Sequence, residues 1–445
     1  MMLEDYIRMN AARWPEKDAI VCGDDTCSYR ELQERIDKRV AALKTEGKDG
    51  QREGGRIVCL RAQPSIDFLT DYFALHLIGC TVAPLDKDLS EEAFRRIADC
   101  LEANHVPRGT ADILYTTGTT GKAKGVIVSH RAILANAENL IEAQGFTHDL
   151  AFVVNGPLNH IGSLSKVYTV LIAGATLIIV DGLKDLNRFF HAFRYPATHM
   201  ATFLVPAAIR MLLSMAAQQL AAIQDKMAFI ETGAAAMPLA DMLTLCRLLP
   251  TTRLYNTYAS TETGIISTHN FNSGKCMPGC LGRPMRHSQV IITPEGRIAC
   301  KGATLMTGYL GDEERTQGIL NNGTVTTSDI GFLDDEGLLH LKGREDDIIN
   351  VGGLKVDPTE VEDAALSHPA VRDCVCIAVD HPLTGQALKL LVVTTGGEPL
   401  SPRNLALHLK TRLERYKIPL LYAQTDHVER TFNGKINRKS YKSPT

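Results

Sequence analysis

The chain has 445 residues, of which 44% are apolar and 22% are charged. This is the composition of a globular protein with a sizeable core, and it excludes whole-chain disorder, collagen-like repeats and a coiled coil. Lys and Arg total 48 against 51 Asp and Glu, a formal charge of −3. Because there is no excess of positive charge, we predict no nucleic-acid partner.

Leader segments, membrane spans and disulfides are not expected. Residues 1–5 carry two acids, Glu4 and Asp5, where a signal peptide would carry basic residues. The longest nearly apolar stretch, residues 167–180, is too short to cross a bilayer and fits a buried strand pair or a core helix. The 11 cysteines are scattered without the spacing of a zinc knuckle, which favours reduced thiols. We therefore expect a cytoplasmic protein without a membrane span.

Short β-branched runs alternate with amphipathic stretches through most of the chain. Strands are predicted at residues 56–60, 81–85, 151–154, 176–180, 201–205 and 229–232, and helices at 66–77 and 206–223. Strand–helix alternation is typical of parallel sheets covered by helices, so the pattern predicts an α/β fold.

The pattern changes near residue 325. Residues 326–340 are rich in Gly and Asp, and a helix at 358–367 and strands at 371–379 and 388–394 follow. We place a domain boundary at about Asp346, which divides the chain into a large domain (1–345) and a small α+β domain (346–445).

Residues 113–130 carry the most informative motif. Two strand-like runs enclose a loop with four hydroxyl residues, three glycines and two lysines. Glycines allow backbone N–H groups to approach an anion, and hydroxyls and lysines add donors and charge, so the loop suits a polyphosphate. It is not a Walker loop, because it lacks that spacing and leads into a strand. A solvated Gly/Thr hairpin loop is the alternative interpretation.

Residues 115–125 resemble the signature loop of the acyl-adenylate-forming superfamily, which includes acyl-CoA synthetases, peptide-synthetase adenylation domains and luciferases. Four further segments resemble motifs of this family and follow in the family's order: residues 256–262, 327–331, 343–353 and 431–438.

The resemblance implies a fold and a reaction. The fold would be α/β, with a large N-terminal domain of parallel or mixed sheets covered by helices, a small barrel-like subdomain and a small mobile α+β C-terminal domain. The N-terminal domain would be shortened between about residues 87 and 112. A carboxylic acid would attack ATP to give an acyl-adenylate and pyrophosphate, and a thiol would then release AMP. Within the family, this chain most closely resembles the short acyl- and aryl-CoA ligases.

The resemblance also implies residue roles around ATP and Mg²⁺. Glu262 would hold Mg²⁺, and Thr261 would donate to the α-phosphate. Asp329 would accept both ribose hydroxyls beside Arg344, and Lys435 would bridge the carboxylate and the α-phosphate as a mobile charge. The β- and γ-phosphates would be cradled by Thr116, Thr117, Gly118, Thr119, Thr120, Gly121 and Lys122. The adenine would lie against Tyr258, the adjacent Asn256 and Thr257, and the small residues Gly233, Ala234 and Ala235.

The remaining motif residues concern the acid and the thiol. His160 and Phe203 would line or gate the acyl pocket. No acidic residue occurs between residues 151 and 180; because a buried ammonium needs a carboxylate, an α-amino acid is disfavoured. Asp346 would be a hinge, and Gly352 and Gly353 would leave room for a pantetheine arm.

Several alternatives remain open. The acceptor is coenzyme A or the phosphopantetheine of an acyl carrier protein, and the acid is apolar or aromatic with its length undetermined. A non-catalytic adenylate-binding protein is the hypothesis of another class. The chain is expected to be a monomer or a loose homodimer.

Overall fold

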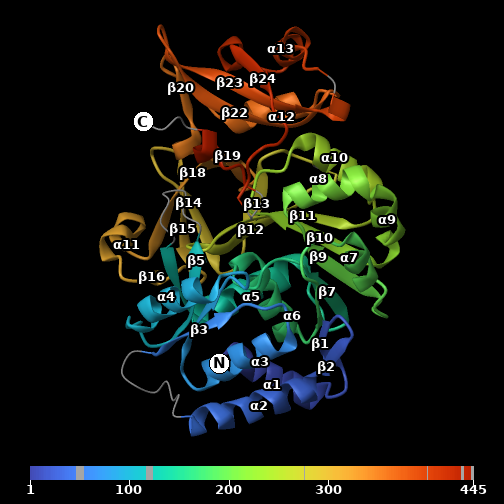
Figure 1. Ribbon diagram of the computed structural model, residues 1–445, viewed down its shortest axis with the longest axis vertical. Helices are drawn as coiled ribbons and strands as arrows, with labels where there is room; N and C mark the ends of the chain where they lie inside the picture. Colours follow the sequence, from blue (N-terminus) through green and yellow to red (C-terminus); the bar gives the residue numbers. More distant parts are fainter. Residues whose placement is uncertain (47–54, 117–123, 275, 398, 432–434, 442–445) are drawn as a thin grey trace.

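A computed structural model describes residues 1–46, 55–116, 124–274, 276–397, 399–431 and 435–441. A large N-terminal part carries a smaller C-terminal part on one end (Figure 1). The last strand of the large part ends at Arg344, a short 3-10 turn η2 (Glu345–Asp347) follows, and the first strand of the small part begins at Ile349.

The largest sheet has 14 strands. Its β2-β1-β8-β7-β9-β10-β11 half is parallel apart from β2, and the β12-β13-β19-β18-β15-β14 half is antiparallel. The antiparallel half continues directly from the parallel half, because β11 pairs with β12 in the same sheet. The strands are β1 (Asp18–Cys22), β2 (Asp25–Ser28), β7 (Leu150–Val154), β8 (Thr176–Ile179), β9 (His199–Phe203), β10 (Met227–Gly233), β11 (Arg253–Ser260), β12 (Gly264–Asn270), β13 (Cys280–Pro284), β14 (Ser288–Ile292), β15 (Arg297–Gly302), β17 (Leu320–Asn321), β18 (Thr324–Leu333) and β19 (Leu339–Arg344).

A second sheet has five strands in the order β16-β6-β5-β4-β3. It joins the strands around the Gly/Thr-rich loop to the N-terminal strands, and α4 lies in the interval where the domain was expected to be shortened. Its strands are β3 (Ile57–Arg61), β4 (Thr81–Leu85), β5 (Thr110–Thr116), β6 (Lys124–Ser129) and β16 (Gly308–Tyr309).

Helices cover both sheets. Four of them begin after a serine whose hydroxyl accepts a backbone N–H of the first turn, which is the usual chemistry of a helix start: Ser28, Ser65, Ser90 and Ser129. The helices are α1 (Leu3–Arg13), α2 (Tyr29–Thr45), α3 (Ile66–Leu77), α4 (Glu91–Glu102), α5 (His130–Gln144), α6 (Ile161–Ala173), α7 (Leu186–Ala192), α8 (Pro206–Met215), α9 (Ala217–Ala222), η1 (Gln224–Lys226), α10 (Leu239–Leu248) and α11 (Glu313–Ile319).

Two expectations differ from the observed elements. The helix expected at residues 206–223 is broken at Ala216, whose φ of −144° is not helical. The break lets Leu212 and Leu220, on either side, enter the same buried cluster. The apolar stretch 167–180 is half helix and half strand, because Gly174 (φ 71°) ends α6 before β8 begins.

The C-terminal part has its own sheet and core. The sheet order is β21-β20-β23-β22 with β24 beside β23, and helices pack on it around Val361, Leu388 and Leu405. Its elements are β20 (Ile349–Val351), β21 (Leu354–Val356), α12 (Pro358–Leu366), β22 (Val371–His381), β23 (Gly385–Thr394), η3 (Thr395–Gly397), α13 (Pro402–Lys410), η4 (Arg415–Lys417), β24 (Leu421–Gln424) and η5 (Arg438–Tyr441).

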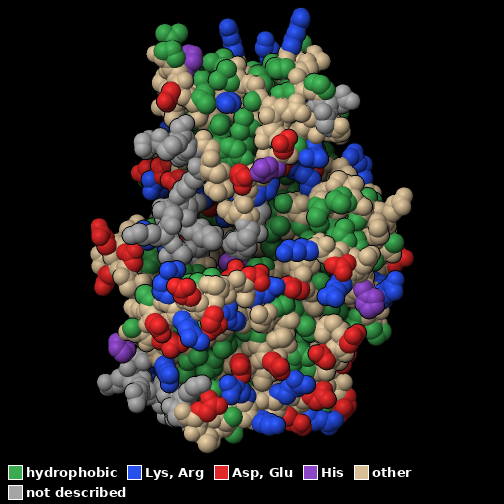
Figure 2. Space-filling view, in the orientation of Figure 1, with side chains coloured by type: hydrophobic (Ala, Val, Ile, Leu, Met, Phe, Trp, Pro, Cys, Tyr) green, Lys and Arg blue, Asp and Glu red, His purple; other side chains and the backbone are tan. Residues whose placement is uncertain are grey.

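The surface carries charges of both signs. Figure 2 shows Lys and Arg interspersed with Asp and Glu over the visible face of the N-terminal part. The 11 cysteines are free thiols. Among the described helices, none has the length and apolar character needed to cross a membrane.

Candidate active site

The predicted phosphate loop connects β5 to β6, and these antiparallel strands pair at Thr116 and Lys124. The loop therefore leads into a strand, as the sequence indicates. Six of the predicted phosphate-binding residues lie outside the described residues: Thr117, Gly118, Thr119, Thr120, Gly121 and Lys122. The first residue after the loop, Lys124, is described by the structure. Its ammonium lies 5.2 Å from the ring centroid of Tyr309.

Tyr309 links this exit to Glu262. Thr261 and Glu262 lie in the turn between β11 and β12, at the end of the large sheet's parallel half. The Tyr309 hydroxyl donates a 2.8 Å hydrogen bond to Glu262 Oε1. This contact orients a half-buried carboxylate close to the strand that leaves the phosphate loop, and carboxylate oxygens are ligands that Mg²⁺ prefers.

Asp329 lies on β18 opposite Arg344 on β19. The Tyr258 hydroxyl donates a 2.7 Å hydrogen bond to Asp329 Oδ2, and Arg344 Nε lies 3.2 Å from Asp329 Oδ1. Burial, followed by the charge of Asp329, holds the pKa of Tyr258 well above its usual value, so this tyrosine stays a donor. Two predicted nucleotide-binding motifs, 71 residues apart in the chain, are thus joined by one hydrogen bond.

The small residues after β10 lie beside the end of β11. Gly233 pairs with Thr257, and a Cβ on Gly233 would lie 2.7 Å from the Thr257 carbonyl oxygen, so only glycine fits. Ala234 has a φ of 70°, which is rare for a residue other than glycine. The side chains of Thr257 and Asn256 bond within the sheet region, to Thr268 Oγ1 and the Cys280 carbonyl. A nucleotide contact at these two positions would therefore come from their backbone.

Lys435 comes close to these residues from the C-terminal part. Its side chain stays exposed to solvent, yet the surrounding protein atoms desolvate it and lower its pKa, and the charge of Arg344 lowers it further. Three carboxylates act in the opposite direction: Asp329, Glu262 and Asp347. The predicted catalytic lysine is thus brought within electrostatic reach of the predicted ribose and metal residues.

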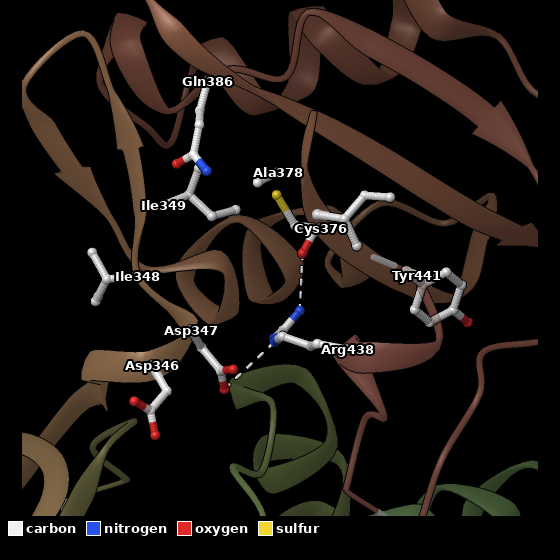
Figure 3. A pocket seen from close by; sticks show the side chains of 10 residues that line it. Asp346, Asp347, Ile348, Ile349, Cys376, Ala378, Gln386, Arg438 and Tyr441 are labelled. Carbon is white, nitrogen blue, oxygen red and sulfur yellow. Dashed lines mark hydrogen bonds and ion pairs between the residues drawn. The ribbon is translucent and has the colours of Figure 1, made fainter. Parts of the chain in front are cut away.

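The contacts that attach the Lys435 segment to the C-terminal part were not predicted from the sequence. Arg438 donates to both oxygens of the buried Glu362 at 2.7 and 2.9 Å and to the Cys376 carbonyl at 2.9 Å. Figure 3 shows Arg438 between Cys376 and Asp347, whose carboxylate lies 3.7 Å from Arg438 Nε. These contacts surround a cavity of about 100 Å³ beside the predicted hinge residue Asp346, too small for a nucleotide.

A second set of contacts that we did not predict from the sequence connects the two parts of the molecule. Asp373 on β22 accepts hydrogen bonds from Arg430 at 2.8 and 3.0 Å and from Arg210 on α8 at 3.1 Å. Arg210 also donates to Asp241 on α10 at 2.9 Å. These residues bridge the C-terminal part to the N-terminal helices just before the Lys435 segment. The sequence offers no local signal for them, because each is an ordinary charged residue on an amphipathic element.

The predicted acyl wall is apolar and aromatic, with a charged pair behind it. The Phe203 ring lies 3.9 Å and 3.7 Å from where Cβ atoms on Gly162 and Gly233 would stand, so it fills the space between them. Burial lowers the pKa of His160 to about 4, which keeps this imidazole neutral near neutral pH. Buried Lys166 bonds Glu231 at 2.8 Å and lies 5.4 Å from the Phe203 ring centroid.

Gly352 and Gly353 are not brought to the predicted nucleotide-binding residues. They form the turn of the β20–β21 hairpin with φ values of 61° and 91°. This hairpin extends away from the N-terminal part in Figure 1. A pantetheine role for these glycines therefore requires the C-terminal part to turn.

A profile of the family described as AMP-binding enzyme matches residues 7–107 and 99–310, and that of the AMP-binding enzyme C-terminal domain matches 360–435. The chain belongs to the AMP-binding enzyme family. The two N-terminal matches meet within the interval predicted to be shortened, and the predicted superfamily is confirmed.

Relatives agree with this membership. A 2-succinylbenzoate–CoA ligase of Staphylococcus epidermidis is 29% identical over 75% of this chain and 69% of its own length. A long-chain-fatty-acid–CoA ligase of Bacillus subtilis is 28% identical over 74% and 60%. The solved O-succinylbenzoate coenzyme A synthetase of Bacillus subtilis, in complex with ATP and magnesium ion, matches with a TM-score of 0.83 over 98% of both chains at 23% identity.

These findings confirm the predicted α/β fold and the predicted enzyme class, an AMP-forming acid–thiol ligase. The solved synthetase holds ATP and a magnesium ion, the two cofactors that we predict for this chain, and the curated relatives are named as ligases of coenzyme A.

Proposed function

We propose that the cleft between the two parts of the chain is the site of both half-reactions, and that Lys435, Glu262 and Asp329 are its central residues. The observation that supports this proposal is that the charges of Asp329 and Glu262, in the N-terminal part, both act on the pKa of Lys435, in the C-terminal part. Each lies in a segment that resembles a family motif.

The first half-reaction brings a carboxylate anion to a polyanion, so the site must neutralise charge where it develops. Lys435, through its ammonium, contacts the acid and the α-phosphate, and Thr261 donates to the same phosphate. Glu262 would hold Mg²⁺, and this ion would supply further positive charge. Asp329, oriented by Tyr258 and Arg344, accepts the ribose hydroxyls.

We infer that the acid carries an apolar or aromatic acyl group. Phe203 between two glycines and a neutral His160 offer an apolar surface without a free charge. Buried Glu231 is occupied by Lys166, so it is not available to bind a substrate ammonium. This supports the prediction against an α-amino acid, and 2-succinylbenzoate and fatty acids, named in the relatives, are the first acids to test.

In the second half-reaction the thiol of coenzyme A attacks the acyl-adenylate. Lys435 must then clear the carbonyl carbon, and a turn of the C-terminal part about Asp346 would do this. The same turn would bring Gly352 and Gly353, which have no side chains, to the path of the pantetheine arm.

The test is ATP–pyrophosphate exchange over a panel of aryl, fatty and α-amino acids, followed by assays of thioester formation with coenzyme A and with a holo acyl carrier protein. We expect exchange with aryl or fatty acids and thioester formation with coenzyme A. Exchange with α-amino acids alone would overturn the acid assignment, and thioester formation on the carrier protein alone would overturn the acceptor.

A further inference from the structure

A cluster of metal-ligating side chains lies in the N-terminal part, outside the cleft. Glu4 of α1, His76 of α3 and His130 at the start of α5 each offer one ligand atom, and these atoms all lie within 4.8 Å of one another. Glu4 is 2% exposed and His76 is 1% exposed. The cluster thus brings three helices to one buried, polar point.

One carboxylate oxygen of the cluster lacks a partner. Glu4 Oε1 bonds His76 Nδ1 at 2.9 Å and His76 Nε2 faces Asp112, but Glu4 Oε2 is buried without a hydrogen-bond partner. Leaving a polar atom buried and unpaired costs free energy, and native proteins rarely do so without a bound group. This oxygen is therefore a second observation, beyond composition, that points to a ligand.

The surroundings suit a metal. His76 Nε2 lies 3.4 Å from Asp112 Oδ1, and Asp112 is itself held by hydroxyl hydrogen bonds from Tyr72 at 2.8 Å and Tyr168 at 2.7 Å. A carboxylate that faces the outer nitrogen of a histidine orients the ring and raises the basicity of its ligating nitrogen. A dication would also balance the two buried carboxylates, Glu4 and Asp112.

We propose that Glu4, His76 and His130 form a Zn²⁺ site, completed by one water ligand, in which Asp112 orients His76. Two imidazoles and one carboxylate suit Zn²⁺ far better than Mg²⁺ or Ca²⁺, which prefer oxygen ligands. The ion connects α1 to α3 and α5, so its role is to hold the N-terminal helix on the domain. The site is independent of the adenylation chemistry.

The test measures zinc in the full-length protein, purified without nucleotide from zinc-supplemented cells. We expect about one zinc ion per chain, lost in Glu4→Gln and in His130→Gln and retained in the matched control His191→Gln, whose side chain is exposed. Circular dichroism checks folding. If His130→Gln fails to fold, the zinc content of the nearly isosteric Glu4→Gln variant still tests the proposal.

Cobalt provides the second readout. Co²⁺ added to metal-stripped protein should give the visible absorption of a four-coordinate site and raise Tm in the wild type and in His191→Gln but not in Glu4→Gln. Wild-type protein that holds no zinc and shows no such absorption would overturn the proposal, and His76 would then be a protonated partner of two carboxylates. A thiolate-to-cobalt band would overturn it too, because cysteines would be the ligands.

Discussion

The side chains of the cleft differ in how much the sequence reveals about them. Asp329 and Glu262 stand in segments whose spacing resembles family motifs, so single residues could be predicted. The Lys166–Glu231 pair could not, because its members are 65 residues apart and each lies in an apolar segment. The only local signal of the pair is that each charged residue stands within an apolar segment that is expected to be buried.

This pair gives the prediction at the residue scale. Glu231→Leu should lower the free energy of unfolding by about 3–5 kcal/mol, because it leaves the Lys166 ammonium buried without a partner. Urea denaturation measures the change.

The matched control is the double variant Lys166→Met/Glu231→Leu, which removes both charges at similar volume and should recover most of the loss. If the single variant were as stable as the wild type, the ammonium would have another partner and the pair would not stabilise the acyl wall.

At the scale of elements, strands and helices were largely predictable because burial imposes a periodicity on the sequence. Helix α3 and strand β4 have the predicted bounds, 66–77 and 81–85. The break at Ala216 was not predictable, since alanine favours helix and only tertiary packing turns the chain there. The attachment of the Lys435 segment through Arg438 to Glu362 was not predictable either, because it also depends on a tertiary contact.

Arg438 provides the prediction for an element. Arg438→Ala should lower the rate of adenylation by about 10- to 100-fold, because it frees the end of the segment that presents Lys435 and a displacement of about 1 Å is enough for such a loss. Single-turnover measurement of acyl-adenylate formation tests this.

Arg403→Ala, at an exposed site on α13, is the control and should leave the rate unchanged. An Arg438→Ala protein that is folded and adenylates at the wild-type rate would show that the segment needs no such attachment.

At the scale of the whole molecule, the placement of the C-terminal part is the feature that sequence reasoning could not supply. Periodicity indicates which face of an element is buried, but not which surfaces of two separate cores meet. The structure brings them together with Lys435 near Asp329 and Glu262, and Asp373 accepts hydrogen bonds from Arg430 and from Arg210.

Asp373→Ala should therefore disfavour this arrangement. We expect adenylation to fall by about 5-fold or more, since a lost interdomain contact shifts the balance between arrangements, while thioester formation from supplied acyl-adenylate is maintained or rises. Rapid-quench assays of the two half-reactions measure both rates.

Asp380→Ala, on the same strand but exposed, is the matched control. An equal loss in both half-reactions of Asp373→Ala would contradict the interpretation, because it would indicate general damage.

The most direct measurement compares the two half-reactions in Lys435→Ala. ATP–pyrophosphate exchange should fall by about 100-fold or more, because the positive charge that contacts the acid and the α-phosphate is removed. Thioester formation from supplied acyl-adenylate and coenzyme A should stay within a few-fold of the wild-type rate. Exchange that survives in the folded variant would contradict the claim that Lys435 completes one cleft with Glu262 and Asp329.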